Sequence, residues 1–530
     1  MSWRSTRAAA RIEQRNRQAA IIDLGSNSWR LVVFTYVPGS WWKRTDELYE
    51  TVRIGAGMAA SGRLGDEAIA RGLETLAVFE RFCVAGGLDR RDVHAVATSA
   101  IREATNREQF LLAARQATGL AITVLSARDE ARYGYVAAVN SSTLADGVVL
   151  DIGGGSMQLT EVGARRAGST ASFKLGAVPL TEQFLPGAGS VKKKDLGRVR
   201  AHVRQALADL DWLPGSGPRL VGLGGAVRNL AAAGQHAAVS ARTGNAHGGI
   251  DLGVQGFVIT PEALGELVQT LASLPSSQRG TVPGIKPGRG DIILAAALVL
   301  QTVIELGEFE GIEASEFGLR EGVFLSRTLF ADSELLLPDV RAAAVANLAI
   351  QYESDMSHVE HVALLSLQMF DSLVEAGLFA PEGGERELLW AASMLHDVGM
   401  TISYVDHHKH SRYLIVSAEL PGFDPRERGL IAQISRYHRK GTPKLGELAP
   451  FARDGDEQLL ERCSVILRLA EHLERGRDQA VSEARLSTNG DGVDLHLRAA
   501  GDLTLPRWSV ERYGDGEVFE RVFGRRLVVG

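Results

Sequence analysis

An apolar run followed by a polar, glycine-containing turn and a second β-rich run occurs twice in the chain. Residues 19–22 (AAII) lead into Asp23-Leu24-Gly25-Ser26-Asn27-Ser28, and residues 147–150 (GVVL) lead into Asp151-Ile152-Gly153-Gly154-Gly155-Ser156. Each copy predicts a strand, a tight loop and a second strand. Helical patterns at 66–84 and 107–118 alternate with short strand patterns at 93–97 and 122–125, which is typical of layered α/β folds. The repeat therefore predicts two similar α/β halves that face each other.

The pattern changes near residue 338. Residues 338–480 have helical periodicity and many histidines, and they predict a separate all-α domain. The tail alternates apolar and polar residues around Asn489-Gly490 and Tyr513-Gly514, which indicates a small domain with β-strands. The predicted organisation is a flexible extension (1–18), half I (19–140), half II (141–330), the helical domain (338–480) and a small C-terminal α+β cap (485–530).

Composition restricts the class of protein. The chain has 530 residues, 45% hydrophobic and 23% charged, and this describes a folded protein too long for one core. A net charge of −6 argues against a nucleic-acid-coating protein but permits local basic pockets. The two distant cysteines, Cys83 and Cys463, indicate a reducing compartment. The longest apolar run, 292–300, is shorter than the roughly 20 residues that a membrane span needs. We expect a cytoplasmic protein with neither a membrane nor a specific nucleic acid as partner.

Both glycine-containing turns have the chemistry of a phosphate site. The backbone N–H groups of such a turn converge on anionic oxygen, and glycine lets the ligand approach closely. An aspartate at a strand end can hold a hydrated Mg²⁺ ion, which normally takes one or two carboxylates. One copy would be a weak signal, because glycine-rich hairpin corners are common. Two copies, each with its own aspartate, predict a clamp on one phosphate chain with Mg²⁺ or Mn²⁺.

Four segments, in this order, resemble a known family. They are 23–28, 97–106 (ATSAIREATN), 151–156 and 222–230 (GLGGAVRNL). Together they are similar to the exopolyphosphatase / guanosine pentaphosphate phosphohydrolase family over residues 19–325. The resemblance implies duplicated actin-like (ribonuclease H-like) halves with the substrate in the cleft between them. It also implies magnesium-assisted release of phosphate from inorganic polyphosphate or from guanosine pentaphosphate, and a homodimer.

The same resemblance assigns roles to individual residues. Arg102 matches the arginine that grips phosphate, and its guanidinium fork suits tetrahedral oxyanions. Glu130 matches the proposed general base for the attacking water. Asp151 matches a magnesium-associated aspartate, Asp23 is its counterpart in half I, and Glu130 is a third candidate metal ligand. The other phosphate-binding candidates are Gly25, Ser26, Asn27, Ser28, Gly153, Gly154, Gly155, Ser156, Gly224 and Gly225.

Departures from the family pattern keep alternatives open. The family has Ser-Thr-Glu after the second loop, whereas this chain has Ser156-Met157-Gln158. Gln158 carries no charge, which makes a polyphosphate or nucleotide sensor without catalysis an alternative. A kinase of the same fold is another, because the same loops bind ATP. Arg102 could instead pair with a neighbouring acid, and Glu130 could be a solvated helix residue.

Histidines and acids recur on successive predicted helices of the segment 338–480. Facing helices can project imidazole and carboxylate groups into a bundle core, as metal sites require. The segment 395–399 (LHDVG) resembles the HD metal-dependent phosphohydrolase superfamily, which implies a divalent metal in an HD-type domain. Structural histidines are the alternative. The candidate ligands are His361, His396, Asp397, His410, His438 and Glu471, where the last stands at the position of the expected aspartate.

Overall fold

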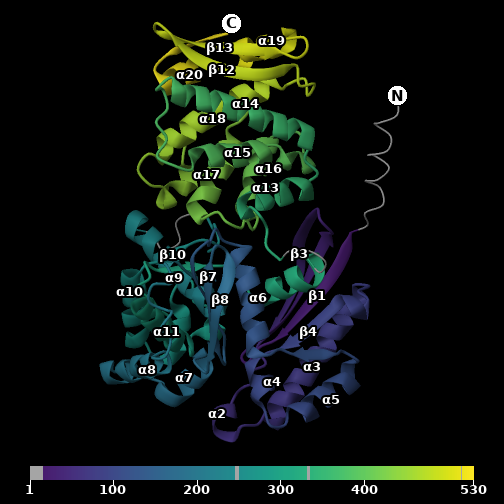
Figure 1. Ribbon diagram of the computed structural model, residues 1–530, viewed down its shortest axis with the longest axis vertical. Helices are drawn as coiled ribbons and strands as arrows, with labels where there is room; N and C mark the ends of the chain where they lie inside the picture. Colours follow the sequence, from purple (N-terminus) through teal and green to yellow (C-terminus); the bar gives the residue numbers. More distant parts are fainter. Residues whose placement is uncertain (1–15, 245–249, 331–334, 515, 530) are drawn as a thin grey trace. The chain divides into compact units, whose positions relative to one another are not determined.

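The computed structural model describes residues 16–244, 250–330, 335–514 and 516–529 (Figure 1). Most of the predicted extension 1–18 lies outside these ranges. The chain divides into two compact units. The first extends to Ala241 and includes Val254–Val340, and the second comprises Arg242–Gly253 and Arg341–Gly530.

A five-stranded sheet forms the first half of the first unit, in the order β3-β2-β1-β4-β5. β1 pairs antiparallel with β2 and parallel with β4, so residues 25–28 are the turn of the β1–β2 hairpin. The strands are β1 (Arg17–Leu24), β2 (Trp29–Val37), β3 (Trp41–Glu50), β4 (Val93–Ala97) and β5 (Ile122–Val124). The helices are α2 (Met58–Ser61), α3 (Asp66–Ala85), α4 (Ser99–Glu103), α5 (Arg107–Thr118) and α6 (Ala127–Val139).

A six-stranded sheet forms the second half, in the order β10-β11-β9-β6-β7-β8. β6 pairs antiparallel with β7 and parallel with β9, as β1 does with β2 and β4, and residues 153–156 form the equivalent turn. The strands are β6 (Gly147–Ile152), β7 (Met157–Gly163), β8 (Arg166–Phe173), β9 (Leu220–Leu223), β10 (Val258–Ile259) and β11 (Ile312–Ala314). The helices are α7 (Ala177–Phe184), α8 (Lys193–Ala206), α9 (Gly225–Thr243), α10 (Pro261–Ser273), α11 (Ile293–Gly307) and α12 (Leu319–Phe324).

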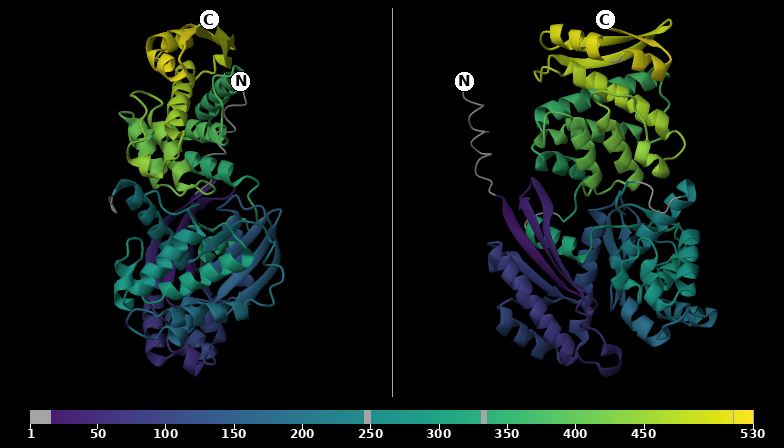
Figure 2. Two further views of the ribbon diagram at one scale, coloured as in Figure 1. Left: turned by 90° about the vertical axis from the view of Figure 1, so that its left-hand side faces the viewer. Right: turned by 180° about the vertical axis from the view of Figure 1, so that it is seen from behind.

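One hydrophobic core joins the two halves around α6 (Figures 1 and 2). It contains Ile21 from β1, Val149 from β6, Val136 from α6 and Phe324 from α12, all buried. α12 lies so close to α6 that a methyl group on Gly322 would be 2.0 Å from the Tyr133 carbonyl oxygen. The two halves therefore form one compact unit, with α6 in their shared core.

The second unit is a helical bundle with a three-stranded sheet in the order β12-β13-β14. A single core runs through both, so the predicted helical domain and cap are not separate packing units. The helices are α13 (Val340–Gln351), α14 (Met356–Glu375), α15 (Glu385–Leu395), α16 (His407–Ser417), α17 (Pro425–Arg436), α18 (Asp456–Leu473), α19 (Thr504–Tyr513) and α20 (Gly516–Phe523). The strands are β12 (Val481–Asn489), β13 (Gly492–Ala499) and β14 (Arg526–Val529). Among all described residues, no helix combines the length and apolar character needed to cross a membrane.

Candidate active site

The two glycine loops, residues 25–28 and 153–156, face each other in the first unit. A methyl group on Gly154 would lie 3.2 Å from the backbone nitrogen of Asn27. One on Gly155 would lie 2.5 Å from Ser99 Oγ and 2.6 Å from Ser26 Oγ. These positions need glycine because any side chain would push the two loops apart. The repeated turns predicted from the sequence thus meet at one place.

A cavity of about 110 Å³ lies between the loops. Twelve of the predicted site residues line it, namely Asp23, Gly25, Ser26, Asn27, Ser28, Glu130, Asp151, Gly153, Gly154, Ser156, Gly224 and Gly225. Two predicted phosphate ligands are not among its lining residues. Gly155 abuts Ser26 and Ser99, and Arg102 is paired with Glu130.

Three carboxyl groups face this cavity, and burial dominates their titration. Burial raises the pKa of Asp23, against the charge of Arg320. Burial, and then the charge of Glu130, raise the pKa of Asp151 to about 7. Burial also raises the pKa of Glu130, against a hydrogen bond from Arg102. Clustered, poorly solvated carboxylates are stabilised by a cation, and oxygen is the donor that Mg²⁺ prefers, so these residues fit a divalent metal.

Glu130 belongs to the first turn of α6, which Ser126 caps by accepting a hydrogen bond from the Asp129 backbone at 3.1 Å. Its Oε2 accepts a hydrogen bond from Arg102 Nη1 at 2.7 Å. Its Oε1 lies 3.5 Å from the Ser156 hydroxyl. The carboxylate is therefore fixed from two sides, and it is buried at the cavity wall rather than solvated on the helix surface.

Gln158 supports the second loop from behind. Its side chain is only 2% exposed, and its Nε2 donates to Ser156 Oγ at 2.9 Å and to Ser172 Oγ at 3.3 Å. Gln158 is not among the residues that line the cavity. It therefore orients the Ser156 hydroxyl, and the chain has an amide where the family pattern has a carboxylate.

Four arginines line the cavity that were not among the predicted ligands: Arg30, Arg228, Arg289 and Arg320. The Arg289 guanidinium packs against Gly225, because a methyl group on Gly225 would lie 2.5 Å from Cζ of Arg289. Burial, and then the charge of Arg320, lower the pKa of Arg228 to about 10. Crowded cations of this kind are relieved by a bound polyanion. Two of these arginines lie in or near a motif, since Arg228 belongs to the segment 222–230 and Arg30 follows the first loop. Arg289 and Arg320 lie in no recognised motif, so the sequence did not indicate them as ligands.

Residues 32–330, more than half of the chain, match the model of the Ppx/GppA phosphatase family. The chain belongs to the Ppx/GppA phosphatase family. Residues 340–505 match the model of Ppx/GppA phosphatase domain III. The family suggested by the four motifs is thereby confirmed, and so is a phosphatase rather than a kinase.

Relatives of this Ppx/GppA phosphatase share nearly its whole length. A Vibrio vulnificus (strain YJ016) protein named guanosine-5′-triphosphate,3′-diphosphate pyrophosphatase is 28% identical over 484 residues, which cover 91% of this chain and 92% of that one. A protein of the same name from Aliivibrio fischeri (strain MJ11) is 27% identical over 507 residues, covering 93% and 95%.

Solved structures confirm the duplicated actin-like α/β fold. The crystal structure of the Aquifex aeolicus Ppx/GppA family member is 26% identical with a TM-score of 0.50, and the match covers 60% of this chain and 100% of that one. An exopolyphosphatase structure from Cytophaga hutchinsonii ATCC 33406 has a TM-score of 0.53 at 19% identity and covers 61% and 100%. The second likeness concerns the fold alone.

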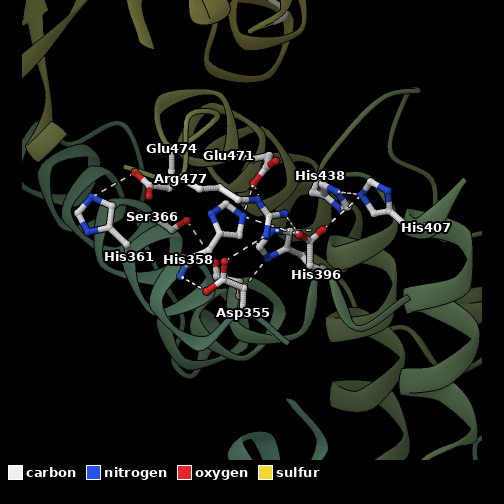
Figure 3. Close-up of polar contacts among 12 residues, drawn as sticks. Asp355, His358, His361, Ser366, His396, His407, His438, Glu471, Glu474 and Arg477 are labelled. Atoms are coloured by element: carbon white, nitrogen blue, oxygen red, sulfur yellow. Dashed lines mark hydrogen bonds and ion pairs between the residues drawn. The ribbon is translucent and has the colours of Figure 1, made fainter. Parts of the chain in front are cut away.

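In the second unit of this Ppx/GppA phosphatase, the structure groups some of the predicted metal ligands with others that were not predicted (Figure 3). His396, Asp397, His438 and Glu471 come together as expected. The cluster is completed by His358 and His407.

His361 and His410, both predicted as ligands, lie outside the cluster. His361 Nε2 lies 2.8 Å from the Val481 carbonyl oxygen and 3.6 Å from Glu474. His410 packs against Gly399, because a methyl group on Gly399 would lie 2.8 Å from Cβ of His410. Each lies three residues after the histidine that takes its place, on the same helix, so helical periodicity alone could not separate the two.

Proposed function

We propose that this Ppx/GppA phosphatase is an exopolyphosphatase, which releases terminal phosphate from inorganic polyphosphate by metal-assisted attack of water. The observation that carries the proposal is the cavity between the two loops, where Asp23 and Asp151 from opposite halves face four arginines. Such a site matches a chain of phosphates with its metal ion. None of the lining residues among the described ranges is aromatic, so the cavity favours phosphate groups over a stacked base.

The residues of the cavity divide the reaction among them. Backbone N–H groups of the loops and the four arginines bind the oxygens of the terminal phosphates. Glu130 accepts a proton from the attacking water. The water oxygen forms a bond to the terminal phosphorus as the phosphoanhydride bond to the shortened chain breaks. A Mg²⁺ or Mn²⁺ ion held by Asp23 and Asp151 would neutralise charge that develops on the phosphate oxygens.

Arg102 enters this proposal through Glu130 rather than through the phosphate. Its guanidinium donates to Glu130 Oε2 at 2.7 Å and to the Leu125 carbonyl oxygen at 3.1 Å. Both bonds tie the start of α6 to the end of α4. We therefore assign Arg102 as a positioning residue that holds the general base.

Guanosine pentaphosphate is the second candidate substrate, favoured by the names of relatives that span about nine-tenths of the chain. A sensor without catalysis is less well supported, because Gln158 lies behind the loop and leaves Glu130, Asp23 and Asp151 at the cavity. A homodimer and a cytoplasmic location stay predictions, and light scattering after gel filtration would test the first.

A direct comparison of substrates tests the proposal. Phosphate release is measured from polyphosphate and from guanosine pentaphosphate, each with Mg²⁺, with Mn²⁺ and with excess chelator. We expect metal-dependent release with the higher kcat/KM for polyphosphate. A higher kcat/KM for guanosine pentaphosphate would show that this nucleotide, rather than polyphosphate, is the substrate. Binding of either compound without phosphate release would show that the protein is a sensor rather than an enzyme.

A further inference from the structure

Six side chains of the second unit come together from α14, α16 and α18 and from the residues just after α15 and α17 (Figure 3). They form two groups, and within each group the ligand atoms lie within 4.8 Å of one another. The first group is His358, His396 and Glu471, and the second is Asp397, His407 and His438. Five of the six are buried and Glu471 is nearly so.

Backbone carbonyls fix the orientation of three of these histidines. The Nδ1 atoms of His396, His407 and His438 lie 2.6, 3.0 and 2.6 Å from the carbonyl oxygen three residues earlier. Each Nδ1–H can donate to that oxygen, so in the neutral ring Nε2 keeps its lone pair. Metal-binding histidines commonly have this arrangement, in which a carbonyl behind the ring sets the tautomer.

The lone pairs then face one another inside the cluster. His407 Nε2 and His438 Nε2 are 3.0 Å apart, a distance at which two lone pairs repel unless a proton or a cation lies between them. For an ion about 2.1 Å from each nitrogen, the N–ion–N angle would be about 90°, which suits octahedral coordination. This pair therefore fits a cation such as Mn²⁺.

A second set of donor atoms converges beside the first. Glu471 Oε2 lies 3.1 Å from His358 Nε2 and 3.3 Å from His396 Nε2. Among the described residues, these three buried atoms form no hydrogen bond of ordinary geometry. Unaligned but close donor atoms are what a shared metal ion requires, since all of them point at the ion rather than at each other.

Asp397 lies between the two groups, and its carboxylate oxygens approach histidines of both. Its Oδ1 is 3.3 Å from His407 Nε2, and its Oδ2 is 3.8 Å from His358 Nε2. A carboxylate in this position can bridge two cations. Arg477 Nη2 donates to Asp397 Oδ2 at 2.7 Å, and its side chain is 39% exposed, so it connects the cluster with solvent.

We propose that the second unit holds two divalent cations bridged by Asp397, and that Arg477 together with these ions binds a phosphate group. The charges support an anionic ligand, because two divalent ions and Arg477 exceed the two carboxylates Asp397 and Glu471 by three positive charges. The proposal concerns a site separate from the loop cavity and does not depend on the substrate of that cavity.

Counting bound Mn²⁺ on the full-length chain tests the pair of ions. Asp23→Asn and Asp151→Asn are introduced first, so that the loop cavity contributes no metal. After chelation and dialysis, titration with Mn²⁺ alone should give two tightly bound ions per chain. Their electron paramagnetic resonance spectrum should show exchange coupling, because bridged ions lie about 3.5–4 Å apart. Fewer than two bound ions, or two uncoupled ones, would overturn the proposal without reference to any further variant.

Further substitutions in this chain assign the ions to their ligands. Asp397→Asn should weaken both ions more than about 100-fold, whereas His358→Ala and His438→Ala should each weaken one. His361→Ala and His410→Ala are matched controls on two of the same helices and should retain both ions. Circular dichroism checks that each variant folds. Equal losses in the control and cluster variants, or an unchanged count in Asp397→Asn, would contradict the assignment.

The anion is tested with inorganic phosphate as the probe. Isothermal titration should show that Arg477→Gln weakens phosphate binding about tenfold and leaves two Mn²⁺ ions in place. Arg475→Gln, which changes an exposed arginine two residues away, is the matched control and should bind phosphate as before. Equal phosphate binding by the two variants would remove Arg477 from the site.

Discussion

Replacing Glu130 by glutamine removes one negative charge from the cavity wall while keeping the shape of the side chain. Glu130 is 7% exposed, and its Oε2 accepts a hydrogen bond from Arg102 at 2.7 Å. A glutamine amide oxygen can accept the same bond, so α6 and the facing loops should keep their positions. The amide cannot, however, accept a proton from the attacking water.

The expected effects on rate and on stability differ in size. A positioned general base contributes about 10²–10⁴-fold to the rate, which corresponds to about 3–5 kcal/mol at 1.36 kcal/mol per tenfold. Loss of charge from the hydrogen bond with Arg102 costs about 1 kcal/mol of stability. Part of that cost is offset, because burial disfavours the charged carboxylate, as the raised pKa of Glu130 indicates. We expect a large fall in kcat and a change in Tm of less than about 4 °C.

The assay is steady-state phosphate release from polyphosphate with Mg²⁺, from which kcat and KM are obtained separately. Asp129→Asn is the matched control, since it removes the charge of a half-buried residue that occupies the adjacent position of the same helix turn and does not line the cavity. The control should retain its kcat. A Glu130→Gln enzyme with kcat within about threefold of the wild type would refute the role of general base.

Three further predictions concern Arg102, Gly176 and the two cysteines. Arg102→Gln should lower kcat more than it raises KM, because Arg102 pairs with the proposed base and does not line the cavity, and a rise in KM alone would make it a phosphate ligand instead. Gly176→Ala would place a methyl group 2.3 Å from the backbone of the second loop and should cost about 1–3 kcal/mol in urea unfolding. Gly189→Ala, which meets open space, should be neutral, and equal midpoints for both would contradict the packing. Burial raises the pKa of Cys83 to about 11 and that of Cys463 further, so both free thiols should react with Ellman's reagent at pH 8 only after unfolding, and rapid labelling of the native protein would contradict their burial.

The two phosphate loops were predictable because their chemistry is local. Each aspartate is the second-last residue of a largely buried strand, one residue before its turn, so Asp23 and Asp151 could be recognised from short segments. The duplication then indicated that the two turns meet. The cavity confirms that they do, since both aspartates line it.

The basic wall of the cavity was less visible in the sequence. Arg289 is the last residue of the short 3₁₀ turn Pro287–Arg289, and Arg320 lies at the start of α12, both far along the chain from either loop. Only tertiary folding brings these side chains to the cavity. No spacing rule connects them with the aspartates, and single arginines are common on protein surfaces.

The histidine cluster shows a different limit. His358 and His361 lie on α14, three residues apart, and both are largely buried, so the helical period does not tell which one faces α18. The same holds for His407 and His410 on α16. The packing of α14 and α16 against their neighbours decides the matter, and it depends on side chains throughout the bundle.

The proposed hydrolysis depends most on the joint action of the two aspartates that reach the cavity from opposite halves. Phosphate release from polyphosphate should therefore be measured for the wild type, Asp23→Asn and Asp151→Asn over a range of Mg²⁺ concentrations. We predict that the wild type needs Mg²⁺ and that each substitution lowers kcat/KM at least about 100-fold, with partial recovery at high Mg²⁺. Release that is independent of metal, or undiminished in both variants, would contradict the account.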